Sequence, residues 1–146
     1  MLIAVGAITR RRPQMFADLL ASFAAMQRPA GCEVIFLFAE NDAEAHVAGQ
    51  VAAFRAAVPE EVRVELEPRP GIPFARNRVL DMARAAGADL LTFVDDDEVV
   101  TPDWLVEVVR AMEERRLDLA GGPVRPVATG EPATAWNAAV FRHLTQ

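Results

Sequence analysis

The chain has 146 residues, of which 52% are apolar and 25% charged, so wholesale disorder is excluded and one domain with a sizeable core is expected. The net charge of −6 argues against electrostatic binding of the whole chain to nucleic acid or to anionic lipid. A single cysteine and two histidines exclude an intramolecular disulfide, a four-cysteine zinc site and a three-histidine metal site.

Short apolar runs alternate along the chain with segments of helical periodicity. In chain order, strands are predicted near residues 2–8, 33–38, 62–67, 90–95 and 117–127. Between them, apolar residues recur at helical spacing within residues 16–23, 47–58, 75–86 and 105–112. In the third strand, Arg63, Glu65 and Glu67 alternate with apolar residues, which predicts that they share a polar face. Thr101 and Pro102 are typical of the first residues of a helix.

The alternation of strands and helices predicts an α/β fold with a mostly parallel sheet and helices on its faces, in one domain over residues 1–146. Because the connections between parallel strands are right-handed, fewer arrangements of the strands are possible. Ligands of such sheets bind beyond the carboxyl ends of the strands. The residues that directly follow the strands are therefore the candidates for a functional site.

Polar side chains follow each of the first four strands. They are Thr9 and Arg10 after the first, Glu40 and Asn41 after the second, Arg76 after the third, and Asp95, Asp96 and Asp97 at the end of the fourth. Because the carboxyl ends of parallel strands meet at one edge of a sheet, these groups are expected to lie near one another.

The run of Asp95, Asp96 and Asp97 directly after an apolar strand is the sharpest signal. Three adjacent carboxylates repel one another, and a divalent cation with a preference for oxygen ligands would relieve that repulsion. Mg²⁺ or Mn²⁺ held by one or two carboxylates can complete its shell with phosphate oxygens. The alternative is a solvated acidic turn before a helix whose dipole favours anions.

Two further strand ends offer nucleotide-binding groups. Arg76 lies in the first turn of a helix, and a helix N-terminus with a guanidinium favours phosphate, although an arginine lying over its own helix is the alternative. Glu40 and Asn41 can hydrogen-bond a base or a ribose, or else cap a helix that begins near Asp42.

The loop after the first strand combines Thr9 with three consecutive arginines. Thr9 can line the same cleft, and Arg10 can meet a diphosphate. Arg11 and Arg12 are expected in a solvated basic turn.

Three segments together resemble the inverting family 2 glycosyltransferases, which have the GT-A fold. They are Gly71–Asn77 (GIPFARN), Leu91–Asp97 (LTFVDDD) and Thr101–Leu105 (TPDWL), and the resemblance extends from Ile3 to about Pro126. It implies that Asp95 and Asp96 contact the ribose and diphosphate region, with Asp97, assisted by Asp95, on the metal. It further implies that Arg76 approaches the nucleotide and that Thr9 and Glu40 hold the base.

This sequence departs from the family pattern at two places. Glu40 stands where an aspartate is more usual, and the segment Thr9–Pro13 lacks the asparagine of the commoner T-x-N-R-P.

The chemistry implied by the resemblance is a single displacement at the anomeric carbon of a nucleotide-sugar, with inversion. The cation would offset charge on the departing nucleoside diphosphate, and a separate carboxylate would deprotonate the acceptor hydroxyl. The segment after Asp97 is shorter than an acceptor-binding half, so this chain is expected to lack most of that half and to bind the donor without efficient transfer. Glu131 is the one late carboxylate kept as a weak candidate for the base.

Two other functions remain as alternatives. One is a non-catalytic module of the same fold that binds a nucleotide or a partner. The other is a nucleotidyltransferase, for which a glycine-rich loop after the first strand would be expected, whereas Thr9–Pro13 contains no glycine.

The remaining expectations concern surroundings and partners. The partners are a nucleotide-sugar donor and an acceptor, with no nucleic acid. Apolar residues between Trp136 and Leu144 predict self-association into a homo-oligomer. No apolar run reaches the roughly 18 residues of a membrane-spanning helix, and the order of basic and apolar residues at the start is wrong for a secretory signal, so a cytoplasmic chain is expected.

Overall fold

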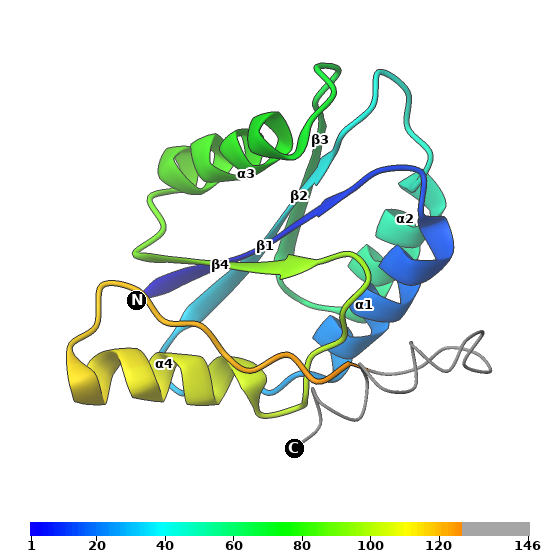
Figure 1. Ribbon diagram of the computed structural model, residues 1–146. Helices are drawn as coiled ribbons and strands as arrows, with labels where there is room; N and C mark the ends of the chain where they lie inside the picture. The colour runs from blue at the N-terminus through cyan, green and yellow to red at the C-terminus, as the bar shows by residue number, and fades with distance from the viewer. Residues whose placement is uncertain (127–146) are drawn as a thin grey trace, which may run out of the picture. The chain divides into compact units, whose positions relative to one another are not determined.

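A four-stranded parallel sheet lies at the centre of the computed structural model, which describes residues 1–126. The strands are β1 (Leu2–Thr9), β2 (Glu33–Glu40), β3 (Glu61–Leu66) and β4 (Leu90–Asp95), in the order β3-β2-β1-β4 (Figure 1). The helices are α1 (Pro13–Ala25), α2 (Ala48–Ala57), α3 (Ile72–Ala86) and α4 (Trp104–Arg115). The predicted α/β fold with a parallel sheet is therefore confirmed.

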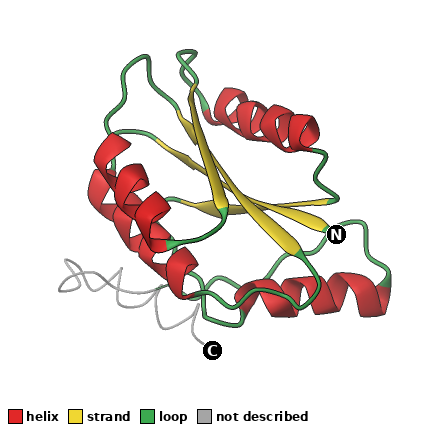
Figure 2. Ribbon diagram, turned by 180° about the vertical axis from the view of Figure 1, so that it is seen from behind, coloured by secondary structure: helices red, strands yellow, loops and turns green. Residues whose placement is uncertain are grey.

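Helices cover both faces of this sheet within the compact unit formed by residues 1–110 (Figure 2). Helices α1 and α2, with Leu105 and Val109 of α4, pack on one face. Helix α3 packs on the other face through Ala75, Val79 and Met82. The sheet is thus the middle of three layers. The loops that lead from each strand into the following helix lie at the edge of the sheet where the strands end.

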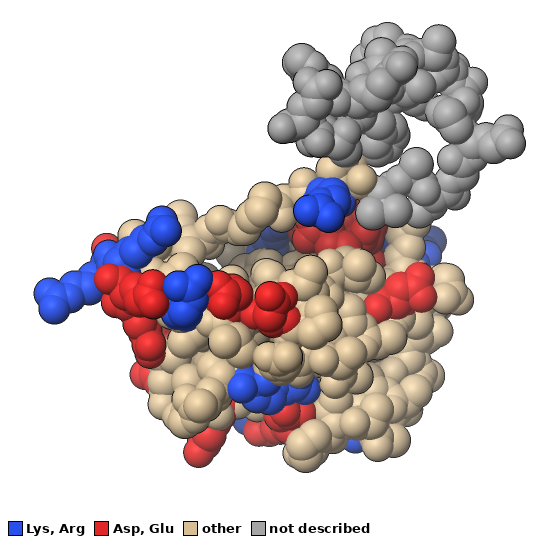
Figure 3. All heavy atoms as spheres, turned by 90° about the horizontal axis from the view of Figure 1, so that it is seen from below, with Lys and Arg blue, Asp and Glu red and all other residues tan. Residues whose placement is uncertain are grey.

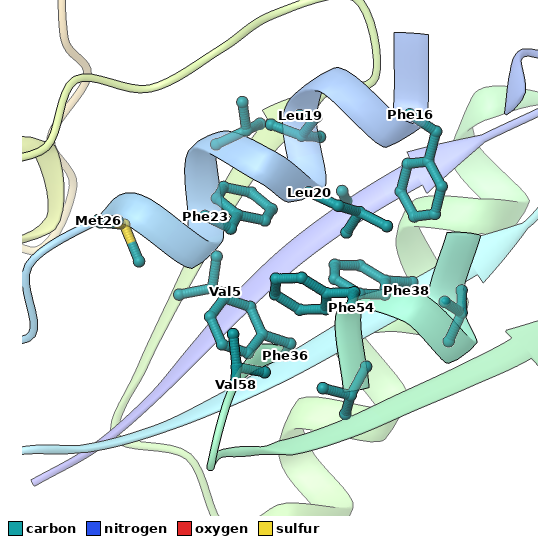
Figure 4. Close-up of a cluster of buried hydrophobic side chains, with 14 of the residues drawn as sticks. Val5, Phe16, Leu19, Leu20, Phe23, Met26, Phe36, Phe38, Phe54 and Val58 are labelled. Carbon is teal, nitrogen blue, oxygen red and sulfur yellow. The ribbon is translucent and has the colours of Figure 1, made fainter. Parts of the chain in front are cut away.

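Phenylalanines fill the core on the α1–α2 side (Figure 4). The rings of Phe16 and Phe38 meet edge to face at 5.3 Å, and those of Phe36 and Phe54 do so at 4.9 Å. Such pairs stabilise a core beyond their buried area alone. Since Leu37 is buried on the opposite face, β2 is apolar on both sides, as expected of a central parallel strand.

Gly6 of β1 lies against Val79 of α3 and the backbone of β4. A Cβ at this position would stand 2.7 Å from Cγ1 of Val79 and 2.9 Å from the carbonyl oxygen of Thr92. The first neighbour is a side chain that can turn, but the second belongs to the backbone of β4. A side chain at residue 6 therefore requires the sheet or the helix to shift.

We expect Gly6→Ala to lower the free energy of unfolding by about 1–3 kcal/mol, the usual range for overpacking a core. Urea unfolding followed by circular dichroism measures the change. Gly49→Ala in α2 is the matched control, because a Cβ there meets no atom within 4 Å and alanine favours a helix. Equal stability of the two variants would contradict this account of Gly6.

The boundaries of three predicted elements differ from the structure. Residues 117–126 form no strand, so the predicted fifth strand is wrong for that part, and Val127 lies outside the described residues. Helix α2 begins at Ala48 and not near Asp42. Helix α4 begins at Trp104, because Thr101 instead forms a turn in which its hydroxyl donates to Asp103.

The chain from Ala111 onward belongs to a second unit, of which residues 111–126 are described. Helix α4 ends there at Arg115, and the amide of Leu117 donates to the carbonyl of Met112. None of the helices found up to residue 126 is long and apolar enough to span a membrane.

Candidate functional site

The polar residues at the strand ends lie along one edge of the sheet, as predicted. Thr9 is the register partner of Glu40 in the β1–β2 pair, and Ile8 is the partner of Asp95 in the β1–β4 pair. The hydroxyl of Thr9 donates a hydrogen bond of 2.7 Å to Oδ2 of Asp96. The ends of β1, β2 and β4 therefore form one continuous polar edge.

Asp96 is the buried member of the acidic run, with 7% of its surface exposed. Its Oδ2 accepts from Thr9 and its Oδ1 accepts from Nη1 of Arg12 at 3.1 Å. Both carboxylate oxygens are thus engaged within the protein. Asp96 ties the loop after β1 to the end of β4 and positions its neighbours.

Asp95 and Asp97 flank it with 53% of each side chain exposed. Asp95 Oδ1 accepts from Nη2 of Arg76 at 2.9 Å, and Asp97 Oδ2 lies 3.5 Å from Nη1 of Arg12. Each contact uses one oxygen of the carboxylate. Each of the three carboxylates therefore contacts an arginine, which offsets part of their mutual repulsion.

Arg11 and Arg12 are exposed, as predicted for a solvated turn, but each also contacts a carboxylate. Arg12 contacts the acidic run, and Nε of Arg11 donates to Oδ2 of Asp42 at 2.6 Å. The hydrogen bond from Arg11 lowers the pKa of the Asp42 carboxyl to about 2. Arg10 is exposed and has no hydrogen-bond or ion-pair partner within residues 1–126. The three arginines therefore have three different environments.

The space-filling view in Figure 3 shows acidic and basic side chains side by side on the face drawn. All basic side chains in it are arginines, since the chain contains no lysine. A guanidinium can bind a carboxylate or a phosphate through two parallel hydrogen bonds.

A divalent cation would find few protein ligands at this edge. No group of three or more His, Cys, Asp and Glu side chains in the described part of the chain could hold a metal ion together. Asp95 and Asp97 are exposed carboxylates on alternate positions, which fits a cation held by one or two carboxylates and completed by phosphate and water. The donor set therefore fits Mg²⁺ or Mn²⁺ that arrives with a phosphate ligand.

Arg76 stands near the start of α3, whose first residues follow Gly71. Gly71 has a φ of 132°, which side chains rarely adopt, so glycine is required at this turn. The guanidinium of Arg76 lies 5.7 Å from the centre of the Phe93 ring while contacting Asp95. Arg76 therefore reaches across the edge instead of lying over its own helix.

Glu40 is almost fully buried, with 1% of its surface exposed. Its Oε1 accepts from the backbone amide of His46 at 2.7 Å, which fixes the loop that precedes α2. The same side chain lines a pocket of about 110 Å³ together with Val47, Val51 and Val64. Glu40 thus combines a structural contact with access to a small apolar pocket.

Asn41 serves the loop between β3 and α3. Its amide nitrogen donates to the carbonyl oxygens of Glu67 and Arg69 at 2.9 and 2.7 Å, and its oxygen accepts from the amide of Gly71 at 2.8 Å. Both amide hydrogens are therefore used within the protein, so Asn41 positions the turn before α3 and has no donor left for a base or ribose.

Glu67 is a site residue that the sequence pattern missed. Instead of lying on a polar face, it has 1% of its surface exposed, directly after the end of β3. Its carboxylate accepts from Nε of Arg69 at 2.8 Å and from Nη2 of Arg78 at 3.1 Å. The hydrogen bond from Arg69 is the main reason why the pKa of Glu67 is lowered to about 2. The two arginines that follow this strand end in the sequence were the available signal that Glu67 is paired.

Glu131, the candidate base, and the apolar residues from Trp136 to Leu144 lie outside the described residues.

Comparison with known proteins identifies relatives along nearly the whole chain. Residues 5–144 match the family described as Glycosyl transferase family 2. A protein of Rhizobium meliloti (strain 1021), the succinoglycan biosynthesis protein ExoM, is 34% identical over 134 residues. That match covers 92% of this chain but 42% of ExoM, so the chain spans less than half the length of this relative.

Solved structures share the fold. S. aureus TarS has a TM-score of 0.62 at 22% identity, with 88% of this chain and 23% of TarS covered. TarS 1–349 in complex with UDP-GlcNAc has a TM-score of 0.60 at 20% identity, covering 86% and 38%. The mannosyltransferase PcManGT of Pyrobaculum calidifontis, in complex with GDP-Man and Mn²⁺, has a TM-score of 0.60 at 18% identity, covering 75% and 32%.

Proposed function

This chain belongs to glycosyl transferase family 2. We propose that it binds a nucleoside-diphosphate sugar, and that the full protein transfers the sugar to an acceptor hydroxyl with inversion. The observation that carries the proposal is the polar edge where β1, β2 and β4 end. There Thr9 is the register partner of Glu40, and Ile8 is the register partner of Asp95. Family membership argues against the nucleotidyltransferase alternative. A non-catalytic module of the same fold stays as an outcome of the test below.

The polar groups at the edge divide by chemistry into those suited to the phosphates, the ribose and the base of the donor. Arg76, near a helix N-terminus, has the charge and geometry for the diphosphate. Asp95 can accept from ribose hydroxyls, and Glu40 can accept from a base N–H at the small pocket. Arg10, exposed and without a partner within residues 1–126, is a second cation for the diphosphate.

A divalent cation, Mg²⁺ or Mn²⁺, is part of the proposal. When bound, it would supply positive charge against the charge that develops on the departing nucleoside diphosphate. Asp97 is its main protein ligand in this proposal, with Asp95 beside it. Asp96 ties the loop after β1 to the end of β4, beside Asp95 and Asp97, and Asn41 fixes the turn that precedes α3 and Arg76.

The donors of the structural relatives define the first substrates to test. We propose UDP- or GDP-linked sugars as the donor class, since TarS is found with UDP-GlcNAc and PcManGT with GDP-Man. The name of ExoM refers to succinoglycan biosynthesis, which supports a saccharide as the acceptor.

Titration calorimetry with UDP-GlcNAc and GDP-Man, each with and without Mn²⁺, tests this function. We expect binding of at least one donor that strengthens when Mn²⁺ is added. Transfer of labelled sugar to saccharide acceptors by the full protein then separates an enzyme from a non-catalytic module. Absence of binding to every nucleotide-sugar would remove the basis of the proposal.

Arg76→Gln should weaken donor binding by about five- to tenfold, because it removes one partly exposed charged contact to the diphosphate. The matched control is Arg84→Gln, which removes the same charge from the last turn of the same helix. Binding constants for both variants are compared by calorimetry at one ionic strength. If the two variants lose affinity equally, Arg76 acts through general charge and not through contact.

A further inference from the structure

Arg12 connects two carboxylates of the acidic run. Its Nη1 lies 3.1 Å from Oδ1 of Asp96 and 3.5 Å from Oδ2 of Asp97. Its backbone is fixed, because it directly precedes α1 and its carbonyl accepts from the amide of Phe16. The backbone of Arg12 is thus fixed at the start of α1, and its guanidinium reaches the residues at the end of β4.

The two contacts of Arg12 differ in strength and in access to solvent. Asp96 is buried and also accepts from Thr9, so its contact with Arg12 is the shorter and better supported one. Asp97 and Arg12 each have 53% of their side chains exposed, and the 3.5 Å between them is at the limit of a hydrogen bond. The contact with Asp96 can therefore persist while the contact with Asp97 opens.

We propose that Arg12 is the resident counter-charge of Asp97, which Asp97 exchanges for a divalent cation when a nucleoside diphosphate binds. This inference rests on the proposed function and extends it to how the site is charged before the donor arrives. The guanidinium released by Asp97 then contacts the diphosphate. Arg12 is accordingly a positioning residue for Asp97 in the free protein and a diphosphate contact in the loaded one.

The exchange keeps opposite charges together at every stage. Asp97 trades a guanidinium for the cation, and Arg12 trades a carboxylate for phosphate oxygens, which suit a guanidinium equally well. An arginine cannot lose its proton to make room for the cation. A cation that arrives alone must therefore compete with Arg12, whereas one that arrives with a diphosphate gives Arg12 a new partner.

This arrangement couples the binding of cation and nucleotide. In the free protein Arg12 weakens cation binding, and in the presence of the diphosphate it does not. Coupling between two ligands is reciprocal, so the cation must strengthen nucleotide binding by the same factor. The neighbouring Arg11 has no part in this coupling, because its guanidinium is held by Asp42.

Binding of Mn²⁺ alone, followed by electron paramagnetic resonance of the free ion, tests the proposal on the full protein. Arg12→Gln should bind Mn²⁺ about two- to fivefold more tightly than the wild-type protein, the range for an exposed ion pair. Arg11→Gln is the matched control, since it removes the same charge one residue away, and its affinity for Mn²⁺ should stay nearer to wild type. Repeating the titration with UDP and with GDP should show less gain in Mn²⁺ affinity for Arg12→Gln than for wild type.

Equal Mn²⁺ affinities of Arg12→Gln and Arg11→Gln would overturn the proposal. Where circular dichroism shows that Arg12→Gln has lost its fold, nuclear magnetic resonance of arginine side-chain N–H groups in the wild-type protein gives the second measurement. The Arg12 signal should shift when Mg²⁺ and UDP or GDP are added together, and an unchanged signal with nucleotide bound contradicts the exchange. Failure of UDP and GDP to bind wild type would instead count against the proposed function, while tighter Mn²⁺ binding by Arg12→Gln would still support the counter-charge.

Discussion

Asp97→Asn should weaken the binding of a nucleoside-diphosphate sugar in the presence of Mn²⁺ by about ten- to hundredfold, with little change in the free energy of unfolding. Loss of one charged contact of roughly 1.5–3 kcal/mol corresponds to that range of affinity. The side chain is 53% exposed and contacts one arginine at 3.5 Å, so little in the fold depends on its charge. Calorimetry with and without Mn²⁺ measures the affinity, and urea unfolding measures the stability.

Asp96→Asn provides the contrast, because Asp96 is buried and its oxygens are engaged by Thr9 and Arg12. We expect this variant to lose stability, since an amide cannot accept at both positions. Asp18→Asn in α1, an exposed change of the same charge, is the control for net charge. Equal donor affinity of Asp97→Asn and Asp18→Asn would show that Asp97 is no ligand of the cation.

The sheet could be predicted because the sequences of its strands follow a simple pattern. Segments such as Glu33–Phe38 are short, apolar and bounded by turn residues, so periodicity and length both indicate a buried strand. The ends were less accurate, since β2 continues to Glu40 where Ala39 and Glu40 still pair with Ile8 and Thr9. Pairing between strands extends an element beyond its apolar run, and one segment read alone does not contain that information.

The clustering of the strand-end residues could be predicted as well, because parallel strands place their carboxyl ends together. What could not be predicted is which side-chain oxygen and nitrogen atoms already form hydrogen bonds within the protein. The side chain of Asn41 has the hydrogen-bonding groups to bind a ribose, but its amide already forms hydrogen bonds to the loop that ends at Gly71. Arg12 and Asp96 are 84 residues apart, and their contact depends on two loop conformations that no local pattern encodes.

Glu67 shows where periodicity stops being informative. Alternation along 62–67 assigns it to the face of Arg63 and Glu65, but β3 ends at Leu66 and the backbone then turns. Beyond the strand, the turn buries the side chain of Glu67, which accepts from two arginines that stay partly exposed. Buried carboxylates in folded proteins are paired. The pairing of Glu67 depends on the conformation of the loop after β3, which the sequence pattern does not reveal.

Glu67→Gln should therefore lower the stability of the fold more than the same substitution at an exposed glutamate. The change leaves Arg69 and Arg78 without their shared carboxylate and removes the anchor of the loop that leads to α3. The urea midpoint at neutral pH is expected to fall clearly below that of wild type. Glu65→Gln is the matched control, because Glu65 contacts Arg78 at 3.4 Å from an exposed position.

The lowered pKa of Glu67 also predicts how the stability difference between wild type and Glu67→Gln changes with pH. The pKa of Glu67 is lowered from 4.5 to about 2 in the folded protein, so its charge contributes stability above pH 4.5. That contribution is lost as the pH falls from 4.5 toward 2, where the folded protein must also take up the proton. The stability difference between wild type and Glu67→Gln should thus be largest near neutral pH and should shrink below pH 4.5. A difference that stays constant down to pH 2 would mean that Glu67 stabilises the loop by its shape and not by its charge.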